Sequence, residues 1–221
     1  MEATKTVHMY LSNSTDRQVF DRLKKQYPNM LIAPSSLRSE QILEKGKQSY
    51  NFPIEESAGN ISKTEKRLAR NDRFVITSIG MFLLQRDPLI IGHEVLQTYP
   101  NATAFTPIVD LLNPLHLETI YNGKWFFTVD QLQIITGRDL LEFRYVGDTQ
   151  QTAADNKSSM DKDSGFVGME PQITLDGDKK TSFDIYVPFD SSHLIVGDAT
   201  HKTHIAFIFR GFLISNSPIK K

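Results

Sequence analysis

The sequence predicts a mainly β fold, and three observations lead to this prediction. Between residues 73 and 215 there are about eight short segments rich in β-branched and aromatic residues. Most of these segments are separated by turn signals, which include an Asn-Gly pair and an Asp-Gly pair. The segments do not alternate with long helical patterns, as the strands of a parallel sheet would. We therefore expect an antiparallel β-sandwich of jelly-roll type, or a related sandwich or barrel.

Residues 1–62 carry helical signals and are expected to form an N-terminal arm, followed by a β-sandwich domain over residues 63–221. The segment "DRQVFDRLKKQY" has apolar side chains on one helical face, namely Val19, Phe20, Leu23 and Tyr27. A second, less amphipathic helix is expected in "SSLRSEQILEKGKQSY", ending near Gly46. The polar stretch 55–62 is expected to be a linker.

The strand candidates share the same enrichment in β-branched and aromatic residues, and lie at 74–84, 104–109, 117–121, 124–129, 140–146, 172–175, 182–187 and 203–215. The pair Asn122-Gly123 is the strongest hairpin signal, because it tolerates the positive φ angles of a two-residue type I′ turn. Asp176-Gly177 indicates a second turn. The segment "DQLQIITGRD" fits a helical turn and a strand equally well.

Two of the candidates are apolar on both faces and should lie in the interior of a sheet. The run 74–84 has only 11 positions and is interrupted by Thr77, Ser78 and Gly80, whereas a membrane-spanning helix needs about 20 mostly apolar residues. We interpret it as a buried strand in which Gly80 permits a bulge or a close approach. The segment 203–215 alternates apolar residues on both faces and is expected to be central.

The composition excludes some classes of function. The formal net charge is only -1, whereas a protein that mainly binds a phosphate backbone usually has a basic surplus. Cysteine is absent, so there is no disulfide, thiolate nucleophile or sulfur-based zinc site. The N-terminal sequence lacks the pattern of a secretory signal, so we expect it to remain in the mature protein, which favours assembly in the cytoplasm.

The basic run ahead of the apolar segment has two interpretations. It contains five cations over 11 residues, which are Lys63, Lys66, Arg67, Arg70 and Arg73, and could form a phosphate-binding ridge. Against this stand Glu65 and Asp72 within the run and the absence of stacking aromatic residues. A solvated or subunit-facing surface is the preferred interpretation.

Two clusters resemble metal sites but are incomplete. His201 and His204 have His193 and Asp198 nearby, but no third ligand at a recognised spacing, so we expect exposed turn histidines. The polar segment 148–170 is expected to be a long loop, and its Asp161/Asp163 pair lacks the glycine position and the closing glutamate of an EF-hand. An irregular calcium site on this loop stays an alternative. The pair Asp176/Asp178 is interpreted as part of a turn.

The common catalytic motifs are also absent. The sequence has no nucleophile elbow, Walker motif, dinucleotide fingerprint or H-E-x-x-H pair. We therefore expect a protein that is not an enzyme, without catalytic, cofactor-binding or metal-binding residues and without a cofactor.

Three parts of the chain together resemble a known family: "RLARNDRFVITSIGMFL", "ETIYNGKWFFTVDQLQIITGRDLLEFRYV" and "PQITLDGDKKTSFDIYVPFD" with "THIAFIFRGFLISN". Their order and texture are similar to those of the jelly-roll capsid and other virion structural proteins of small tailless icosahedral DNA phages. In such proteins a jelly-roll subunit ends in an apolar strand and a short polar tail. The chain departs from this family in two ways, because a double jelly-roll subunit would be longer and the N-terminus lacks a dense basic arm.

The resemblance implies a structural virion protein that self-assembles into an icosahedral shell. Its partners would be copies of itself and other virion proteins, without specific nucleic-acid recognition, and the site of assembly would be the host cytoplasm. Whether a membrane lies beneath the shell is left open. The helical arm, through Phe20 and Leu23, and the 148–170 loop are expected to make the contacts between subunits.

The alternative function is a ligand- or carbohydrate-binding β-sandwich module. Sugar platforms need exposed aromatic side chains, and the candidates are Tyr121, Trp125, Phe126 and Phe127 beside the Asn-Gly pair. We expect most of them to be buried.

Overall fold

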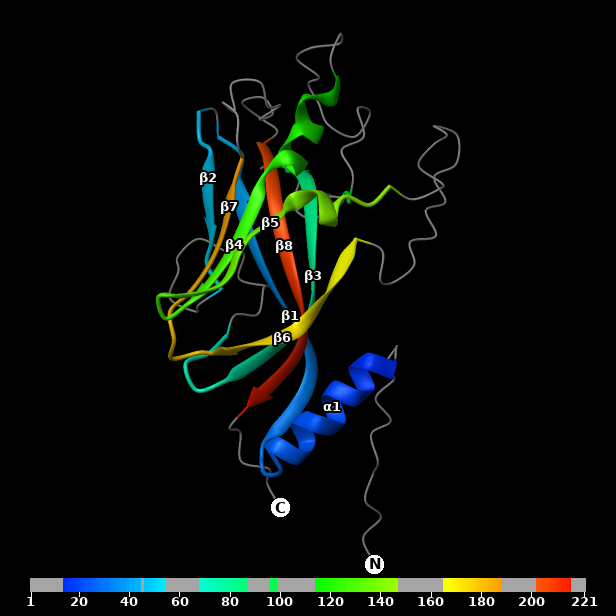
Figure 1. Cartoon of the computed structure of the whole chain (residues 1–221), viewed down its shortest axis with the longest axis vertical. Helices are drawn as coiled ribbons and strands as arrows, with labels where there is room; N and C mark the ends of the chain where they lie inside the picture. The colour runs from blue at the N-terminus through cyan, green and yellow to red at the C-terminus, as the bar shows by residue number, and fades with distance from the viewer. Residues whose placement is uncertain are drawn as a thin grey trace, which may run out of the picture.

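The computed structural model describes residues 14–44, 46–54, 68–86, 96–98, 114–146, 165–187 and 202–215. These residues are mainly β (Figure 1). In chain order the elements are α1 (Ser14–Gln26), β1 (Leu31–Ile42), β2 (Ser49–Phe52), β3 (Arg73–Arg86), the 3₁₀ helix η1 (Pro114–Asn122), β4 (Lys124–Val129), β5 (Leu132–Asp139), the 3₁₀ helix η2 (Leu140–Phe143), β6 (Phe166–Asp176), β7 (Thr181–Tyr186) and β8 (Lys202–Ser215).

The strands form two antiparallel four-stranded sheets. The first sheet has the order β1-β8-β3-β6, and the second has the order β2-β7-β4-β5. Along the chain the strands switch between the sheets at almost every step, and β4 and β5 are the two consecutive described strands that pair in one sheet. The antiparallel, mainly β prediction is therefore confirmed.

One hydrophobic core lies between the two sheets and receives side chains from both. The ring centroid of Phe183 on β7 lies 4.6 Å from that of Phe207 and 5.2 Å from that of Phe209, both on β8. The Phe52 ring on β2 lies 4.8 Å from the Phe207 ring. All four rings are fully buried. Because these contacts join strands of different sheets, the fold is β-sandwich-like.

The outer face of the first sheet is covered at both ends. At one end α1 packs on it, as Figure 1 shows, and the cluster contains Val19 and Leu23 of the helix with Ile32, Val75, Phe212 and Ile214 of the sheet. At the other end residues 96–98 lie beside β3, joined by a bridge between Leu83 and Gln97. Leu96 packs there against a second small cluster formed by Phe82, Leu84 and Ala206. This cover explains why β3 and β8 are apolar on both faces, and both are central, as predicted.

Close backbone contact at β3 depends on glycine. The register of β3 shifts between Ile76 and Ser78, where Gly211 of β8 lies opposite Ile76. A Cβ on Gly211 would overlap the carbonyl group of Val75. The expected close approach at Gly80 is also observed, since a Cβ there would lie 2.9 Å from the Gly165 carbonyl oxygen.

The outer face of the second sheet carries polar side chains. Asn51 Nδ2 donates hydrogen bonds to Ser182 Oγ at 2.9 Å and to Asp184 Oδ1 at 2.7 Å. The Ser182 hydroxyl in turn donates to Asp184. This face therefore follows the alternation of buried and exposed positions expected of a sheet that is covered on one side.

The prediction of a helical N-terminal arm is correct for the first helix and wrong for the residues that follow it. The amphipathic helix is present as α1, but the second expected helix, in residues 35–50, is strand β1 followed by the turn to β2. Strand β1 pairs with β8 over 12 positions, and this pairing outweighs a weak helical pattern. Since β1 and β2 belong to the two sheets, residues 31–42 and 49–52 are part of the β structure and not of an arm.

Two strand predictions are also wrong. Residues 117–121 lie in η1, and the segment expected at 140–146 begins with η2. The ambiguous segment is strand β5. The candidate at 104–109 lies outside the described residues, and so does most of the expected loop at 148–170, of which residues 166–170 belong to β6.

The hairpin turn lies elsewhere than predicted. It connects β4 to β5 through Asp130 and Gln131, which have φ angles of 49° and 69°. Gly123 instead follows η1, its N–H donates to the Ile120 carbonyl, and a Cβ on it would lie 2.6 Å from the Tyr186 carbonyl oxygen. The glycine thus serves a close backbone approach. The turn at Asp176-Gly177 is present between β6 and β7.

Candidate assembly surface

His204 is buried, so the expectation of an exposed turn histidine is wrong. It lies on the central strand β8, opposite Ile42 of β1 and Leu84 of β3. Its Nδ1 atom lies 3.9 Å from Glu40 Oε2, and Arg86 pairs with the same oxygen at 3.0 Å. Arg38 pairs with the other oxygen of Glu40. The site is an ion cluster that joins the three strands β1, β8 and β3.

The sequence does contain a signal for this cluster. Arg38 and Glu40 are two residues apart, a spacing that places both side chains on one face of a strand. Because the sequence analysis expected a helix here, it did not predict that these two side chains lie on one face. His193, Asp198 and His201 lie outside the described residues, as do Asp161 and Asp163. Within the described part of the chain, no group of three His, Asp or Glu side chains is arranged to hold a metal ion.

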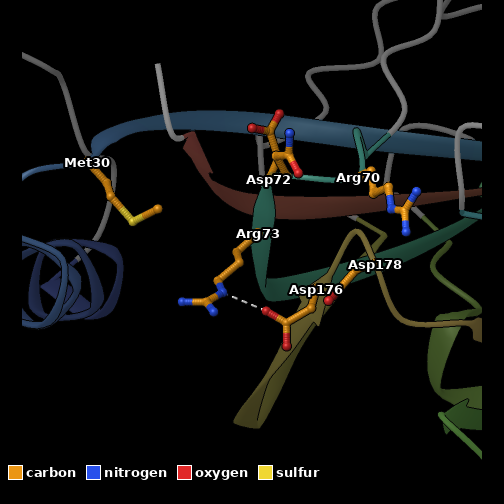
Figure 2. Close-up of a pocket in the computed structure, with 7 residues that line it drawn as sticks. Met30, Arg70, Asp72, Arg73, Asp176 and Asp178 are labelled. Atoms are coloured by element: carbon orange, nitrogen blue, oxygen red, sulfur yellow. Dashed lines mark hydrogen bonds and ion pairs between the residues drawn. The ribbon is translucent and has the colours of Figure 1, made fainter. Parts of the chain in front are cut away.

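The basic run ends at an open cavity of about 300 Å³ (Figure 2). Its lining contains both signs of charge: Met30, Arg70, Asn71, Asp72, Arg73, Asp176 and Asp178. Arg73 Nε donates to Asp176 Oδ1 at 2.6 Å, and this hydrogen bond raises the pKa of Arg73. The other oxygen of Asp176 lies 3.4 Å from Lys179 Nζ. The charges largely neutralise each other, so the cavity does not form a phosphate ridge.

The rest of the basic run is only partly described. Lys63, Lys66 and Arg67 lie outside the described residues, and Arg70 is exposed. Arg73 lies with its guanidinium carbon 5.5 Å from the centre of the Tyr27 ring. Arg73 therefore connects Tyr27, the residue that follows α1, to Asp176 at the end of β6.

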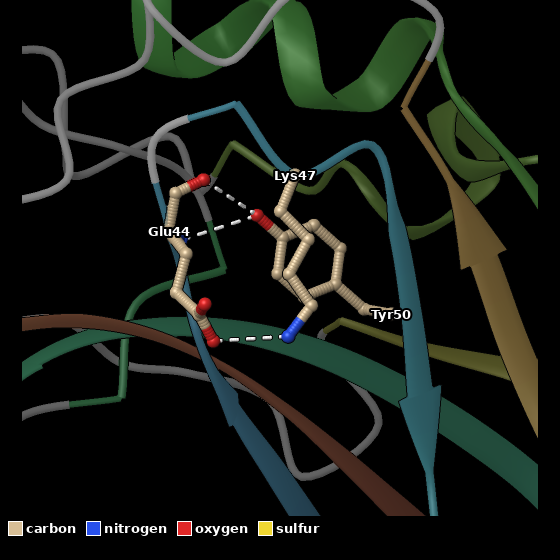
Figure 3. Close-up of polar contacts among 3 residues, drawn as sticks. All are labelled: Glu44, Lys47 and Tyr50. Carbon is tan, nitrogen blue, oxygen red and sulfur yellow. Dashed lines mark hydrogen bonds and ion pairs between the residues drawn. The ribbon is translucent and has the colours of Figure 1, made fainter.

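The segment between Ile42 and Ser49 crosses from β1 in the first sheet to β2 in the second, and we call it the crossover. Tyr50 on β2 forms hydrogen bonds with Glu44 in this crossover (Figure 3). Its hydroxyl donates to the Glu44 carbonyl oxygen and accepts from the Glu44 backbone N–H, both at 3.2 Å. Lys47 Nζ lies 2.9 Å from Glu44 Oε1 and 5.0 Å from the centre of the Tyr50 ring. Burial raises the pKa of Tyr50, and the Glu44 carboxylate adds to this, while the hydrogen bond from Glu44 N–H opposes it.

Most of the aromatic residues near Gly123 are buried, as expected. Tyr121, Trp125 and Phe127 are at most 1% exposed, and Phe126 is partly buried. Trp125 Nε1 donates to Glu142 Oε1 at 2.6 Å. The rings of Tyr121, Trp125 and Phe127 fill the core, so they do not form an exposed platform for a sugar.

The described residues also include several exposed apolar side chains. They are Leu31, Ile42, Leu132, Ile134, Leu141, Tyr145 and Tyr186. Leu132 and Ile134 lie on the same strand, β5, which forms one edge of the second sheet. The helix α1, by contrast, has its apolar face on its own first sheet, where Leu23 is 2% exposed. This packing corrects the expectation that Leu23 docks on a neighbouring subunit.

Comparison with protein-family models, with curated proteins and with solved structures finds no match for this chain. In the described ranges, no helix combines the length and the apolar character needed to span a membrane.

Proposed function

We propose that this chain is a jelly-roll protomer of a virion shell, a capsid protein that assembles with copies of itself and with other virion proteins. Its place would be the virion of a tailless icosahedral bacteriophage, after assembly in the host cytoplasm. The proposal combines the sequence resemblance with the pairing of the strands.

The pairing of the strands carries the proposal. A jelly roll of eight strands consists of two Greek keys folded into two sheets and is found in viral capsid proteins. Such a roll results when a long antiparallel ribbon pairs its first strand with its last and then wraps around a core. The observed pairs β1–β8, β2–β7, β3–β6 and β4–β5 follow that rule, and the pairs β3–β8 and β4–β7 join them into sheets.

Two further observations agree with a structural role. Tyr121, Trp125 and Phe127 are buried, which removes three of the four aromatic candidates for a carbohydrate-binding platform. The polar clusters around Glu40 and Asp176 are paired acids and bases that join strands. A shell is most simply closed by symmetric repetition of one chain.

The test is assembly of the purified full chain. We expect large, uniform particles in negative-stain electron microscopy and a matching high-mass species in light scattering after size exclusion. A protein that stays strictly monomeric at high concentration, across the salt and pH conditions that favour shell assembly, would contradict the proposal. A glycan array run on the same material would detect the carbohydrate-binding alternative.

A further inference from the structure

The pair Asn122-Gly123 forms the junction between η1 and β4 and has a chemistry of its own. The backbone nitrogen of the residue after an asparagine can attack the side-chain amide carbon. Glycine is the least hindered residue at that position, because it has no side chain. Asn122 is exposed, and its side chain makes no hydrogen bond with the described residues. The amide group that the reaction needs is therefore accessible.

The reaction is a deamidation, which consumes one water molecule and needs no other reactant. A bond forms between the Gly123 nitrogen and Cγ of Asn122, while the bond from Cγ to the amide nitrogen breaks. The amide nitrogen leaves as ammonia and takes the proton of the Gly123 N–H. Water then opens the resulting five-membered succinimide at either of its two carbonyl groups. One opening gives aspartate, and the other gives isoaspartate, in which the main chain runs through the side-chain carbon and is one atom longer.

The fold holds the attacking nitrogen in a hydrogen bond. The buried Gly123 donates its N–H to the Ile120 carbonyl oxygen at 3.1 Å, and its own carbonyl accepts from the Leu140 N–H at 2.9 Å. To reach Cγ of Asn122, the nitrogen must give up this hydrogen bond, which costs free energy at a buried position. The deamidation therefore proceeds from an open form of the junction.

The closed junction has no space for a longer main chain. A Cβ on Gly123 would lie 2.6 Å from the Tyr186 carbonyl oxygen and 2.9 Å from Leu140 Cδ1. The next residue, Lys124, pairs with Tyr186 on one side and with Asp139 on the other. An extra main-chain atom before Gly123 must displace the glycine from this contact or shift β4 against its neighbours. Aspartate, by contrast, adds only a charge at an exposed position.

We propose that Asn122 is a site of spontaneous deamidation that the fold protects, and that its isoaspartate product prevents the η1–β4 junction from closing again. This inference goes beyond the proposed function and does not depend on it, because it concerns the lifetime of a single chain. The modified fraction records the time that a chain has spent with the junction open.

Peptide mapping of the full-length protein by mass spectrometry tests the protection. A synthetic peptide of residues 118–126, in the same mildly alkaline buffer, gives the unprotected rate. Deamidation of Asn122 should be at least about tenfold slower in the native protein, because the rate follows the population of the open form. Asn51 is the control within the chain, since it is also exposed but precedes the bulky Phe52 and should stay unmodified. Equal rates at Asn122 in the protein and the peptide would overturn the proposal.

A second experiment tests the effect of the isoaspartate. Asn122→Asp contains the aspartate product without the longer main chain, and it should unfold at the same urea concentration as the wild type. Wild-type protein aged in guanidinium chloride and then refolded contains both products. Its isoaspartate fraction, quantified by peptide mapping, should unfold at a lower urea concentration than Asn122→Asp. If the two unfolded at the same concentration, the junction would accept the longer chain and the proposal would fail.

Asn122→Gln is the matched variant for the ageing step. Its longer side chain cannot form the five-membered ring, so the variant should keep its stability after the same treatment. A loss as large as that of the aged wild type would contradict the proposal, because the damage would then arise at another residue.

Discussion

The two sheets share one core but differ in what covers their outer faces. The first sheet has α1 at one end of its outer face and residues 96–98 at the other. The second sheet presents the polar network of Asn51, Ser182 and Asp184 on its outer face. The central strands β3 and β8 of the first sheet are therefore apolar on two faces, and a strand of the second sheet is apolar on one.

The burial of individual strands follows this difference. Strand β8 is buried at almost every position from Thr203 to Ile214, and β7 alternates between buried and partly exposed positions. Edge strand β5 is exposed along most of its length. Layer and position in the sheet, rather than strand propensity, thus determine how apolar each strand is.

The largest expected effect is at the contact between the sheets. Phe207→Ala should destabilise the protein by about 3–5 kcal/mol, because it removes a buried ring and leaves a cavity between β8 and β7. Urea unfolding followed by fluorescence of the buried Trp125 measures the change. Phe207→Leu keeps most of the volume and should cost clearly less. A loss below 1 kcal/mol for Phe207→Ala would show that the two sheets do not depend on this contact.

The cover on the first sheet should contribute next. Leu23→Ala on α1 should cost about 2–4 kcal/mol, because Leu23 is buried against that sheet. The measurement is the same unfolding experiment, with far-ultraviolet circular dichroism to follow the helix.

Asn51→Ala is the matched change on the second sheet. It removes hydrogen bonds that lie at the surface, so we expect a loss of about 1 kcal/mol or less. If both variants lost the same stability, the helix would not act as a cover, and the contrast between the sheets would fail.

The sequence predicts the strands whose environment leaves a simple pattern. The fully apolar strands β3 and β8 and the alternating strands β4 and β7 are found close to their predicted bounds. Strand β1 is missed because its outer face holds the ion cluster of Arg38 and Glu40, whose polar residues resemble the exposed side of a helix. Its pairing with β8 connects residues about 170 positions apart in the chain, and no local pattern reports such a contact.

The position of the hairpin turn and the exposed edge of β5 could not be predicted from the local sequence either. Gly123 follows an Asn, as a hairpin turn would require, but it is needed for contact with the Tyr186 backbone in a strand far along the chain. The actual turn uses Asp130 and Gln131, a pair without a glycine. The β5 edge is visible only after the sheet order is known, because an exposed Ile134 and a buried isoleucine are identical in the sequence.

The last prediction concerns Tyr50, at the connection between the two sheets, and depends on pH. Burial raises the pKa of Tyr50 above its ordinary value, which is about 10. Above pH 10 the unfolded state therefore releases the phenol proton before the folded state does. The free energy of unfolding should fall as the pH rises from about 10 through the folded pKa, and Tyr50 should add no pH dependence below that range.

Tyr50→Phe should weaken this alkaline loss of stability. At neutral pH the variant should be less stable by about 1 kcal/mol, because the Glu44 N–H and C=O groups lose their partner. Tyr186→Phe is the matched control, because it removes the same atom from a ring that is 43% exposed, and it should keep the wild-type alkaline slope. Urea midpoints measured from pH 8 to pH 11.5 provide the comparison. If Tyr50→Phe lost stability above pH 10 as steeply as the wild type, the crossover would be open to water, and its hydrogen bonds would not join the covered sheet to the open one.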